Sequence, residues 1–349
     1  MEVLVLGYFE DYQSALYIVE SFKELGHDVQ GISSRKIVMD LGIDEGQERI
    51  LQEVDEYVNE IKKSPDIVLV LKGSEMTYET LKTIKEKFPE AKFVNWFFDV
   101  YMNNKPIWQK EDYYPTIKLF DYYFCSLKGV ADNLKEKGFK NVYYLDEAAS
   151  LKYNGKVYMN WYQEQQYGED VAFIGTLGLK DIHKHRISVI KKIIDEGFRI
   201  KIWGNVACSW KELGEDIYNV HTKTPVINQQ HSMVCQASKL IIGVDQDRNI
   251  ELGHSARLYR VLACGGTYLL NATKGVNKMF KVNKDGQDIT GDEELIFYYS
   301  YDDLVNKMDF LLEHDDIRRR IGENGMKKVI EKHTWDERIK EMIEIMKGD

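Results

Sequence analysis

Short apolar runs alternate with helical segments along the chain, and this alternation limits the fold more than any other feature. The run EVLVL (2–6) precedes a segment with apolar residues at helical spacing (14–25), after which Gly26 is placed to end the helix. Further strands are predicted at 67–73, 92–99, 120–126 and 141–146, and further helices at 48–63, 77–88 and 128–137. Buried strands that each lead into a helix are typical of a parallel sheet, so we expect a doubly wound α/β domain.

The alternation stops between residues 147 and 169, a stretch rich in Tyr, Gln and Asn, and then resumes. Strands are predicted at 170–178, 199–205 and 239–244, with a helix at 183–198. Three late helices are predicted at 302–314, 317–332 and 335–347. We therefore expect a first domain at 1–150, a linker at 151–168, a second domain at 169–333 and a last helix at 334–349.

Two doubly wound Rossmann-like domains are expected to face a central cleft, with ligands outside the carboxyl ends of the strands. The residues that directly follow the predicted strands are therefore the first candidates for a site. They lie at 7–11, 73–75, 99, 175–179, 203–205 and 244–247.

Charge and composition narrow the class of partner. The chain carries a net charge of −10, and residues 1–150 hold 18 basic and 27 acidic side chains. That balance disfavours nucleic acid, whose phosphates need Lys and Arg. The absence of a long apolar run predicts no membrane span, and the acidic start MEVLVLGYFED predicts no signal peptide. Four widely spaced cysteines suit a reducing cytoplasm, which is the expected location.

Several common site motifs are missing from the sequence. The first strand leads into GYFEDYQSA rather than GxGxxG, and neither a GxxxxGK[ST] phosphate loop nor a GxSxG motif occurs. His183 and His185 are two residues apart, so on a helix they point in different directions. We expect no bound metal and no nucleophile of the serine-hydrolase type.

The stretch HSARLYRVLACGG (254–266) offers cationic groups instead. Ser255 and Arg257 are predicted to open a helix, where backbone N–H groups favour an anion and an arginine can bind phosphate bidentately. Arg260 follows on nearly the same face. Cys264, Gly265 and Gly266 are interpreted as a structural stop of small residues before a buried strand. Glycines 175 and 204, each at the end of a strand, would let backbone approach a ligand. Surface arginines on a solvated helix face remain the simpler alternative.

These segments together resemble the glycosyltransferase-like proteins typified by the spore-maturation protein CgeB, which have the two-domain GT-B fold. The matching pieces are FIGT with a downstream HR, IKIWG, ASKLIIGV, SARLYRVLACGG and the tail HTWDERI. PDIVLVLKG, VNWFFD and FDYYF of the first half match less sharply. The resemblance implies a metal-independent, retaining transfer of a sugar from a nucleoside diphosphate, with a UDP-sugar as the expected donor and no other cofactor.

The resemblance also implies roles for individual residues. Arg186 and Arg257 would face the phosphates of the donor, beside Ser255 and the glycine turns. The nucleotide pocket would further include Gly175, Thr176, Trp203, Gly204, Val220 and His221. The last helix would cross back to the first domain. On the acceptor side the candidates are Asp99 as a catalytic group, with Glu10, Asp11 and Glu147 beside it.

Two positions depart from the family pattern. Related retaining enzymes hold the ribose with a glutamate where this chain has Arg260, and often carry another glutamate where it has Gly253. Glu251 is near enough in sequence to take over the ribose. Two other readings therefore stay open: a nucleotide-sugar epimerase of the same architecture, and a non-catalytic nucleotide-sugar-binding or coat protein. The acceptor, whether a glycan, a protein or a small molecule, is not specified by any motif.

Overall fold

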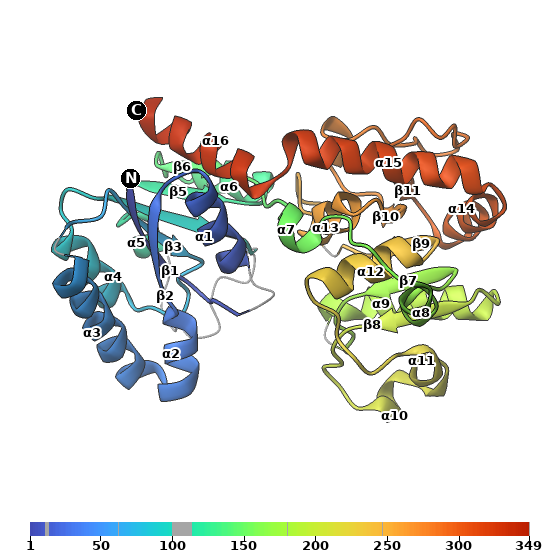
Figure 1. Cartoon of the computed structure of the whole chain (residues 1–349), viewed down its shortest axis with the longest axis horizontal. Coiled ribbons are helices and arrows are strands. Elements are labelled where there is room, and N and C mark those ends of the chain that lie inside the picture. Colours follow the sequence, from blue (N-terminus) through green and yellow to red (C-terminus); the bar gives the residue numbers. More distant parts are fainter. Residues whose placement is uncertain (11–13, 62, 100–113, 180, 246, 349) are drawn as a thin grey trace. The chain divides into compact units, whose positions relative to one another are not determined.

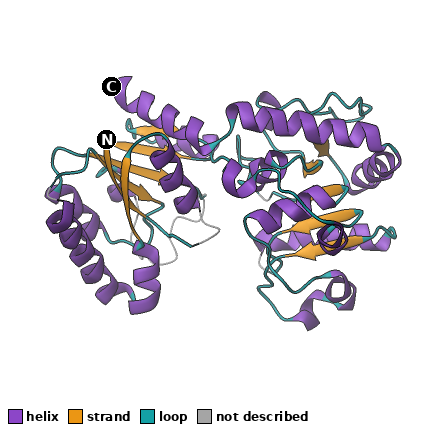
Figure 2. Ribbon diagram, in the orientation of Figure 1, coloured by secondary structure: helices purple, strands orange, loops and turns teal. Residues whose placement is uncertain are grey.

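The computed structural model describes residues 1–10, 14–61, 63–99, 114–179, 181–245 and 247–348. The chain divides into two compact units. Unit 1 comprises Met1–Glu147 together with Trp335–Asp349, and unit 2 comprises Ala148–Thr334 (Figure 1). Each unit contains a parallel sheet with helices packed around it (Figure 2). The predicted α/β class with two parallel sheets is confirmed.

Unit 1 is built on a six-stranded sheet in the order β2-β1-β3-β4-β5-β6, and its paired strands are parallel. The strands are β1 (Glu2–Leu6), β2 (Asp28–Ile32), β3 (Ile67–Leu71), β4 (Lys92–Phe97), β5 (Tyr122–Cys125) and β6 (Val142–Tyr144). All five residues of β1 and of β3 are buried, as expected for central strands covered on both faces.

The helices of unit 1 connect these strands. They are α1 (Ser14–Glu24), α2 (Ser34–Leu41), α3 (Ile43–Ile61), α4 (Tyr78–Lys87), α5 (Tyr114–Ile117) and α6 (Lys128–Glu136). The sequence predicts a single helix at 48–63, but the structure has α2 and α3 in succession. Gly42 between them has a φ of 87°, which ends the first helix so that the chain can turn into the second.

The last helix, α16 (Trp335–Gly348), belongs to unit 1 although it is distant from the rest of that unit in sequence. It packs along α1. The buried ring of Trp335 meets the ring of Trp96 on β4 edge-on at 5.4 Å between centroids. Arg338 donates from Nε to the carbonyl oxygen of Glu147. These contacts give α16 a buried face within unit 1.

Unit 2 contains a five-stranded sheet in the order β11-β10-β9-β7-β8, again with parallel pairs. Its strands are β7 (Val171–Ile174), β8 (Ile200–Trp203), β9 (Leu240–Gly243), β10 (Tyr268–Asn271) and β11 (Ile296–Tyr298). One face of the sheet forms the main core with helices α9 (Asp181–Asp195), α11 (Glu215–Val220), α14 (Tyr301–Glu313) and α15 (Asp315–Lys332).

The remaining helices of unit 2 include two in the segment that was expected to be a linker. They are α7 (Leu151–Asn154), α8 (Trp161–Tyr167), α10 (Trp210–Leu213), α12 (Gln229–Ala237), α13 (Arg257–Ala263) and the 3₁₀ helix η1 (Val276–Lys278). Residues 151–168, expected to form a linker, contain α7 and α8 and belong to unit 2. Both helices pack on α12. The sequence lacked a helical period here because these helices are short and mostly exposed.

The glycines that follow α13 end it as predicted. Gly265 has a φ of 84°, and the N–H of Gly266 donates to the carbonyl oxygen of Val261 at 3.1 Å. A Cβ on Gly322 of α15 would lie 2.5 Å from the carbonyl oxygen of Gly265. The small residues therefore allow α15 to approach the end of α13 closely, and β10 follows at once.

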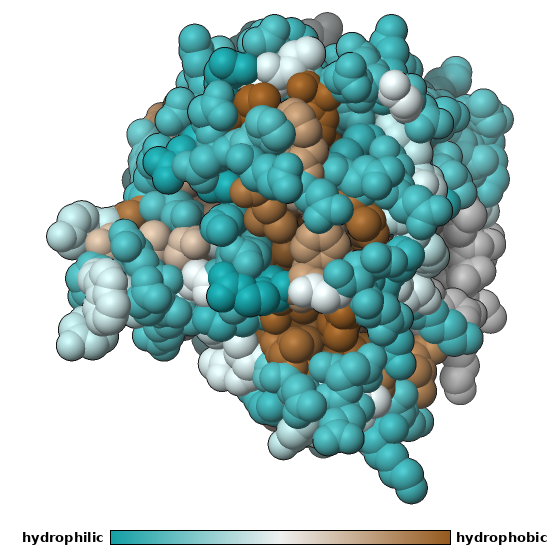
Figure 3. All heavy atoms as spheres, turned by 90° about the vertical axis from the view of Figure 1, so that its right-hand side faces the viewer, coloured by the Kyte–Doolittle hydropathy of each residue, from teal (hydrophilic) through white to brown (hydrophobic). Residues whose placement is uncertain are grey.

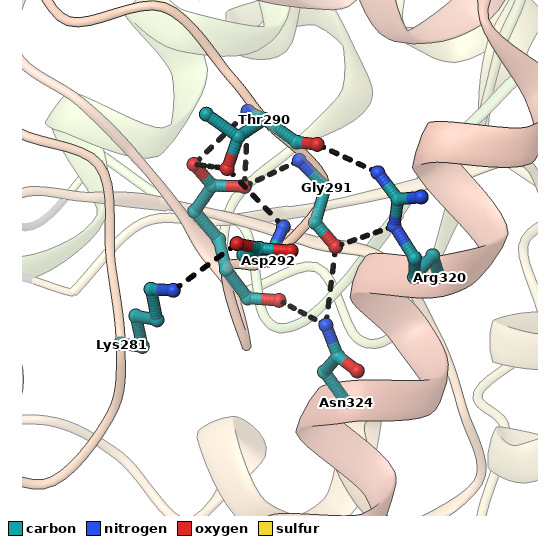
Figure 4. A network of polar contacts seen from close by, with 7 residues as sticks. Lys281, Thr290, Gly291, Asp292, Arg320 and Asn324 are labelled. Carbon is teal, nitrogen blue, oxygen red and sulfur yellow. Dashed lines mark hydrogen bonds and ion pairs between the residues drawn. The ribbon is translucent and has the colours of Figure 1, made fainter.

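A polar network fixes the segment between η1 and β11 (Figure 4). Both oxygens of the Glu293 carboxylate accept hydrogen bonds from the N–H groups of Thr290 and Gly291. Arg320 and Asn324 of α15 donate to carbonyl oxygens of the same turn. Because each of these donors meets an acceptor, the network stabilises a segment that has little regular secondary structure.

The surface of unit 2 carries both hydrophobic and hydrophilic side chains. Figure 3 shows hydrophobic groups in a row between hydrophilic ones on the face seen there. Among the helices that the structure describes, none is long and apolar enough to cross a membrane.

Candidate functional site

Two glycines meet at the carboxyl edge of the unit 2 sheet. Gly175 follows β7 and Gly204 follows β8, and the N–H of Gly175 donates to the carbonyl oxygen of Trp203 at 2.9 Å. A Cβ on Gly204 would lie 2.4 Å from the carbonyl oxygen of Gly175. Gly204 also has a φ of 141°, a conformation that favours glycine. The sequence placed both glycines at strand ends, and the structure brings their backbones into contact.

Arg186 on α9 reaches back to this edge. Its Nη1 donates to the carbonyl oxygen of Thr176 at 2.9 Å and lies 3.2 Å from Nδ1 of His183. Burial, and after it the charge of Arg257, lowers the pKa of Arg186 to about 10. The two guanidinium groups are therefore close enough to repel one another.

Arg257 opens α13 and points to the same edge. Its Nη2 is 2.9 Å from the point where a Cβ on Gly175 would lie, and its guanidinium carbon is 5.8 Å from the centre of the Phe173 ring. Nη1 of Arg257 and Nε of Arg186 are buried and have no hydrogen-bond partner among the described residues. Buried N–H groups of this kind are costly to leave unpaired, so an anion at this edge would stabilise both arginines.

Asp245, directly after β9, is the acidic residue of the site. Its backbone N–H donates to Oδ1 of Asn271 and its carbonyl oxygen accepts from Nδ2 of Asn271, both at 2.7 Å. The hydroxyl and the N–H of Ser255 donate to its carboxylate at 2.9 and 3.2 Å. Asp245 also acts electrostatically on Arg186, whose pKa it raises against the larger opposing effects. The sequence predicted a site residue within 244–247 but gave no sign of these partners.

Two candidates for the ribose pocket make other contacts. Glu251 forms ion pairs with Lys278 at 2.6 Å and with Lys274 at 3.7 Å, both in the segment after β10. Arg260, one turn beyond Arg257, lies near buried His231 of α12. Burial and then the charges of Arg260 and Arg257 lower the pKa of His231 to about 3. His231 is thus neutral in the folded chain at neutral pH.

The candidates for the base pocket separate into two places. Trp203 packs on Tyr167 of α8 at 5.6 Å between ring centroids, whereas His221 packs on Trp210 of α10 at 4.9 Å. His221 pairs with Ile202 through an isolated bridge, and neighbouring residues of a strand alternate in direction. The side chains of Trp203 and His221 therefore lie on opposite faces of β8. Val220, half-buried, packs against the core beside His221.

His221 is buried, and its environment keeps it neutral. Nδ1 accepts a hydrogen bond from the N–H of Lys223 at 2.8 Å, and Nε2 is buried without a partner in the described parts of the chain. Burial, followed by the charge of Lys223, lowers the pKa of His221 to about 4. Because Nδ1 accepts, Nε2 of the neutral ring carries the proton and can donate a hydrogen bond to a ligand or a water.

The acceptor-side candidates lie in unit 1. Asp99, just after β4, forms an ion pair with Lys72 at 2.7 Å, and 58% of its side chain is exposed. Glu147 accepts a hydrogen bond from the hydroxyl of Ser14, so its contacts tie α1 to the segment after β6. Glu10 is half-buried. Asp11 lies outside the described residues. Across the described residues, no cluster of three or more His, Cys, Asp or Glu side chains could hold a metal ion.

Comparisons with known proteins agree with this architecture. Residues 186–344 match the glycosyl transferase-like family, a segment that includes both Arg186 and Arg257. The catalytic domain of starch synthase IV from Arabidopsis thaliana, solved with ADP and acarbose, is similar in structure. Its TM-score is 0.62 at 10% identity, over 93% of this chain and 94% of that one.

Two further solved structures cover nearly the whole chain. A glycosyltransferase of avilamycin A biosynthesis has a TM-score of 0.53 at 11% identity, over 94% of this chain and 96% of its own. A UDP-GlcNAc 2-epimerase from Neisseria meningitidis, bound to UDP-GlcNAc, has a TM-score of 0.53 at 13% identity and full coverage of both chains. No curated protein matches the sequence significantly. The chain has the GT-B fold. The match of residues 186–344 to the glycosyl transferase-like family supports glycosyl transfer as the general class of activity, and the solved neighbours show the fold.

Proposed function

We propose that this protein is a glycosyltransferase of the CgeB-like type that binds a nucleoside-diphosphate sugar, with a UDP-sugar as the first candidate, at the carboxyl edge of the unit 2 sheet. One observation carries the proposal. Arg186 and Arg257 repel each other, and each has a buried N–H group without a partner among the described residues. A diphosphate supplies the negative charge and the acceptor oxygens that this pair lacks.

The same arginines suit the chemistry of the transfer. When the bond between the sugar and the diphosphate breaks, negative charge grows on the leaving phosphate. Fixed guanidinium groups stabilise that charge more in the transition state than in the bound donor, and they need no metal to do so. The glycine at 175 lets the Arg257 guanidinium lie against the backbone, and with Thr176 and Gly204 it forms the strand-end turns beside which we place the phosphates.

The other candidate residues receive narrower roles. We assign Trp203, Val220 and His221 to the surroundings of the nucleoside at the end of β8, and Glu251 and Arg260 to the ribose. Ser255 would assist in binding the phosphates, with its hydroxyl either bonded to Asp245, as in the structure, or turned towards the ligand. Asp99 remains the candidate for the acceptor in unit 1, where Lys72 keeps it paired. We propose a retaining outcome on the family resemblance.

The donor can be tested by thermal-shift measurements with UDP-, GDP-, TDP- and CDP-sugars, followed by assays of donor hydrolysis. One of these donors should stabilise the protein. Arg257→Gln and Arg186→Gln should each lower hydrolysis by about 100-fold, as removal of a transition-state hydrogen-bond donor does. Arg319→Gln is the matched control because Arg319 lies exposed on α15. Stabilisation by none of the donors, or unchanged hydrolysis in Arg257→Gln, would refute the site.

An epimerase is the second candidate, because several UDP-GlcNAc 2-epimerases resemble the whole chain in structure. NMR of the products separates the two reactions. An altered sugar that forms without any acceptor supports an epimerase, whereas an unaltered sugar released to water supports a transferase. Donor binding with no turnover at all supports a non-catalytic binding protein.

A further inference from the structure

The start of α8 exposes three aromatic side chains. Tyr158, Trp161 and Tyr162 are 91%, 64% and 76% exposed, more than any other large apolar or aromatic residue in the described chain. We call these three residues the α8 aromatic patch. Trp161 and Tyr162 meet edge-on, with 5.1 Å between their ring centroids. Exposed apolar groups that cluster on a surface mark candidate interaction sites.

The patch stands on a firmly held element. Asn160 caps α8: its side-chain oxygen accepts from the N–H of Gln163 at 3.1 Å, and the Gln163 side chain accepts from the N–H of Asn160 at 3.0 Å. At the other end, Tyr167 is buried against Trp203. Just before the helix, the Gln236 side chain exchanges two hydrogen bonds with the backbone of Val157. The backbone that carries the rings is therefore anchored on both sides rather than part of a loose segment.

The segment that carries the rings has mostly uncharged polar side chains, and Lys201 of β8 bonds to the carbonyl oxygens at the far end of α8, from Gln165 to Gly168. From Tyr158 to Tyr167 the sequence is YMNWYQEQQY, which holds four amide side chains and one charged residue, Glu164, in a chain where 30% of residues are charged. A nucleic acid or an anionic membrane surface would call for lysines or arginines among the rings. This segment has none. Aromatic rings and amides together suit a neutral ligand that has both apolar faces and hydroxyl groups.

We propose that the α8 aromatic patch is a docking site for a neutral glycan. A sugar ring has a face of C–H groups that an aromatic ring can cover, and its hydroxyls can bond to amides. The proposal rests on the proposed function, since a glycosyltransferase meets such a chain as acceptor or product. Anchoring a glycan at α8 raises the local concentration of its other residues near unit 2.

Native affinity electrophoresis tests the patch directly. The full chain is run through gels that contain dextran, glycogen, mannan, xylan or hydroxyethyl cellulose. At least one polysaccharide should retard it. The double variant Trp161→Ala/Tyr162→Ala should lose about tenfold or more in apparent affinity, because two stacking surfaces are removed. Tyr218→Ala is the control, since Tyr218 is an exposed tyrosine of the same unit on α11.

Three results would overturn the proposal. The first is passage of the protein through every gel unretarded, and the second is equal retardation of the double variant and the parent. The third is a concentration-dependent dimer, seen by light scattering, that the double variant abolishes, which would assign the patch to a second copy of the chain. Donor stabilisation is measured in the same double variant and should be unchanged. Retardation without donor binding would support the glycan site and contradict the proposed transferase. Donor binding without retardation would support the transferase and contradict the glycan site.

Discussion

Arg186 and Arg257 are two cations that act on one another, with the acid Asp245 nearby. Asp245 offsets part of their repulsion, but its carboxylate is also occupied by Ser255. Such an arrangement lowers the stability of the folded chain when no anion is bound. The lost stability is recovered when an anion binds. Sites for charged ligands commonly show this conflict between stability and binding.

Replacing one arginine should therefore separate the two effects. Without ligand, Arg257→Gln should unfold at the same temperature as the parent or a higher one, because the repulsion with Arg186 is gone. With the donor, its affinity should fall by about 30-fold, equivalent to roughly 2 kcal/mol for a charged hydrogen bond. Scanning calorimetry with and without donor measures both. A melting temperature several degrees lower without ligand would show that Arg257 has a mainly structural role.

His231 gives unit 2 a predictable dependence on pH. Its pKa is about 3 in the folded chain and near 6.5 when unfolded. Above pH 6.5 both states are neutral, so His231 does not affect the pH dependence. Below pH 6.5 only the unfolded state takes up a proton, so folding loses stability until the folded pKa is reached. The loss should be about 1.4 kcal/mol per pH unit.

Urea unfolding at pH 7, 6 and 5 checks this prediction. As the pH is lowered below 6, the stability of His231→Asn should decrease less steeply than that of the parent. The two slopes should differ by about 1.4 kcal/mol per pH unit. His221→Asn should act in the same direction, since the pKa of His221 is also lowered. Equal slopes in parent and variant would mean that His231 accepts a proton in the folded chain. The absolute stability of the variant does not enter the comparison.

At the scale of elements, the contact between the turns after β7 and β8 depends on glycine. Gly204→Ala should lower the free energy of unfolding by about 2–4 kcal/mol, because both the positive φ and the collision with Gly175 act against it. Gly197→Ala is the matched control: Gly197 also has a positive φ, of 83°, but its Cβ would meet nothing within 4 Å. It should cost only about 1 kcal/mol. Chemical denaturation of both variants gives the comparison, and equal losses would argue against a tight contact.

At the scale of the whole molecule, α16 brings the end of the chain back into unit 1, so loss of its packing should destabilise unit 1 rather than unit 2. Trp335→Ala removes a buried ring from between α16 and β4 and should cost about 3–5 kcal/mol. Hydrogen exchange should speed up in β4 and α1 of unit 1. Exchange in β9 and β10 of unit 2, and stabilisation by the donor, should change little. Trp161→Ala, at an exposed position, is the control for loss of a tryptophan. Equal loss of protection in both units would indicate that they unfold together.

Much of the fold follows from local sequence patterns. The apolar runs that became β1, β3, β7 and β9 are short and continuous, and glycines stand where strands or helices must turn. The end of α13 was predicted for the same reason, since small residues and a left-handed glycine have few other uses after a helix. Helices α2, α5, α7, α8, α10 and α11 and strands β2 and β11 were not predicted, because such short elements carry almost no periodic signal.

The sequence by itself determined the class of the fold, the strand ends and the arginines that follow them. Only the tertiary structure decided which groups meet there. Ser255 bonds to Asp245, Glu251 pairs with Lys278, and Trp203 and His221 lie on opposite faces of β8. The reason is physical: strand and helix periods are set by neighbours a few residues apart, whereas these contacts join groups that only packing brings together.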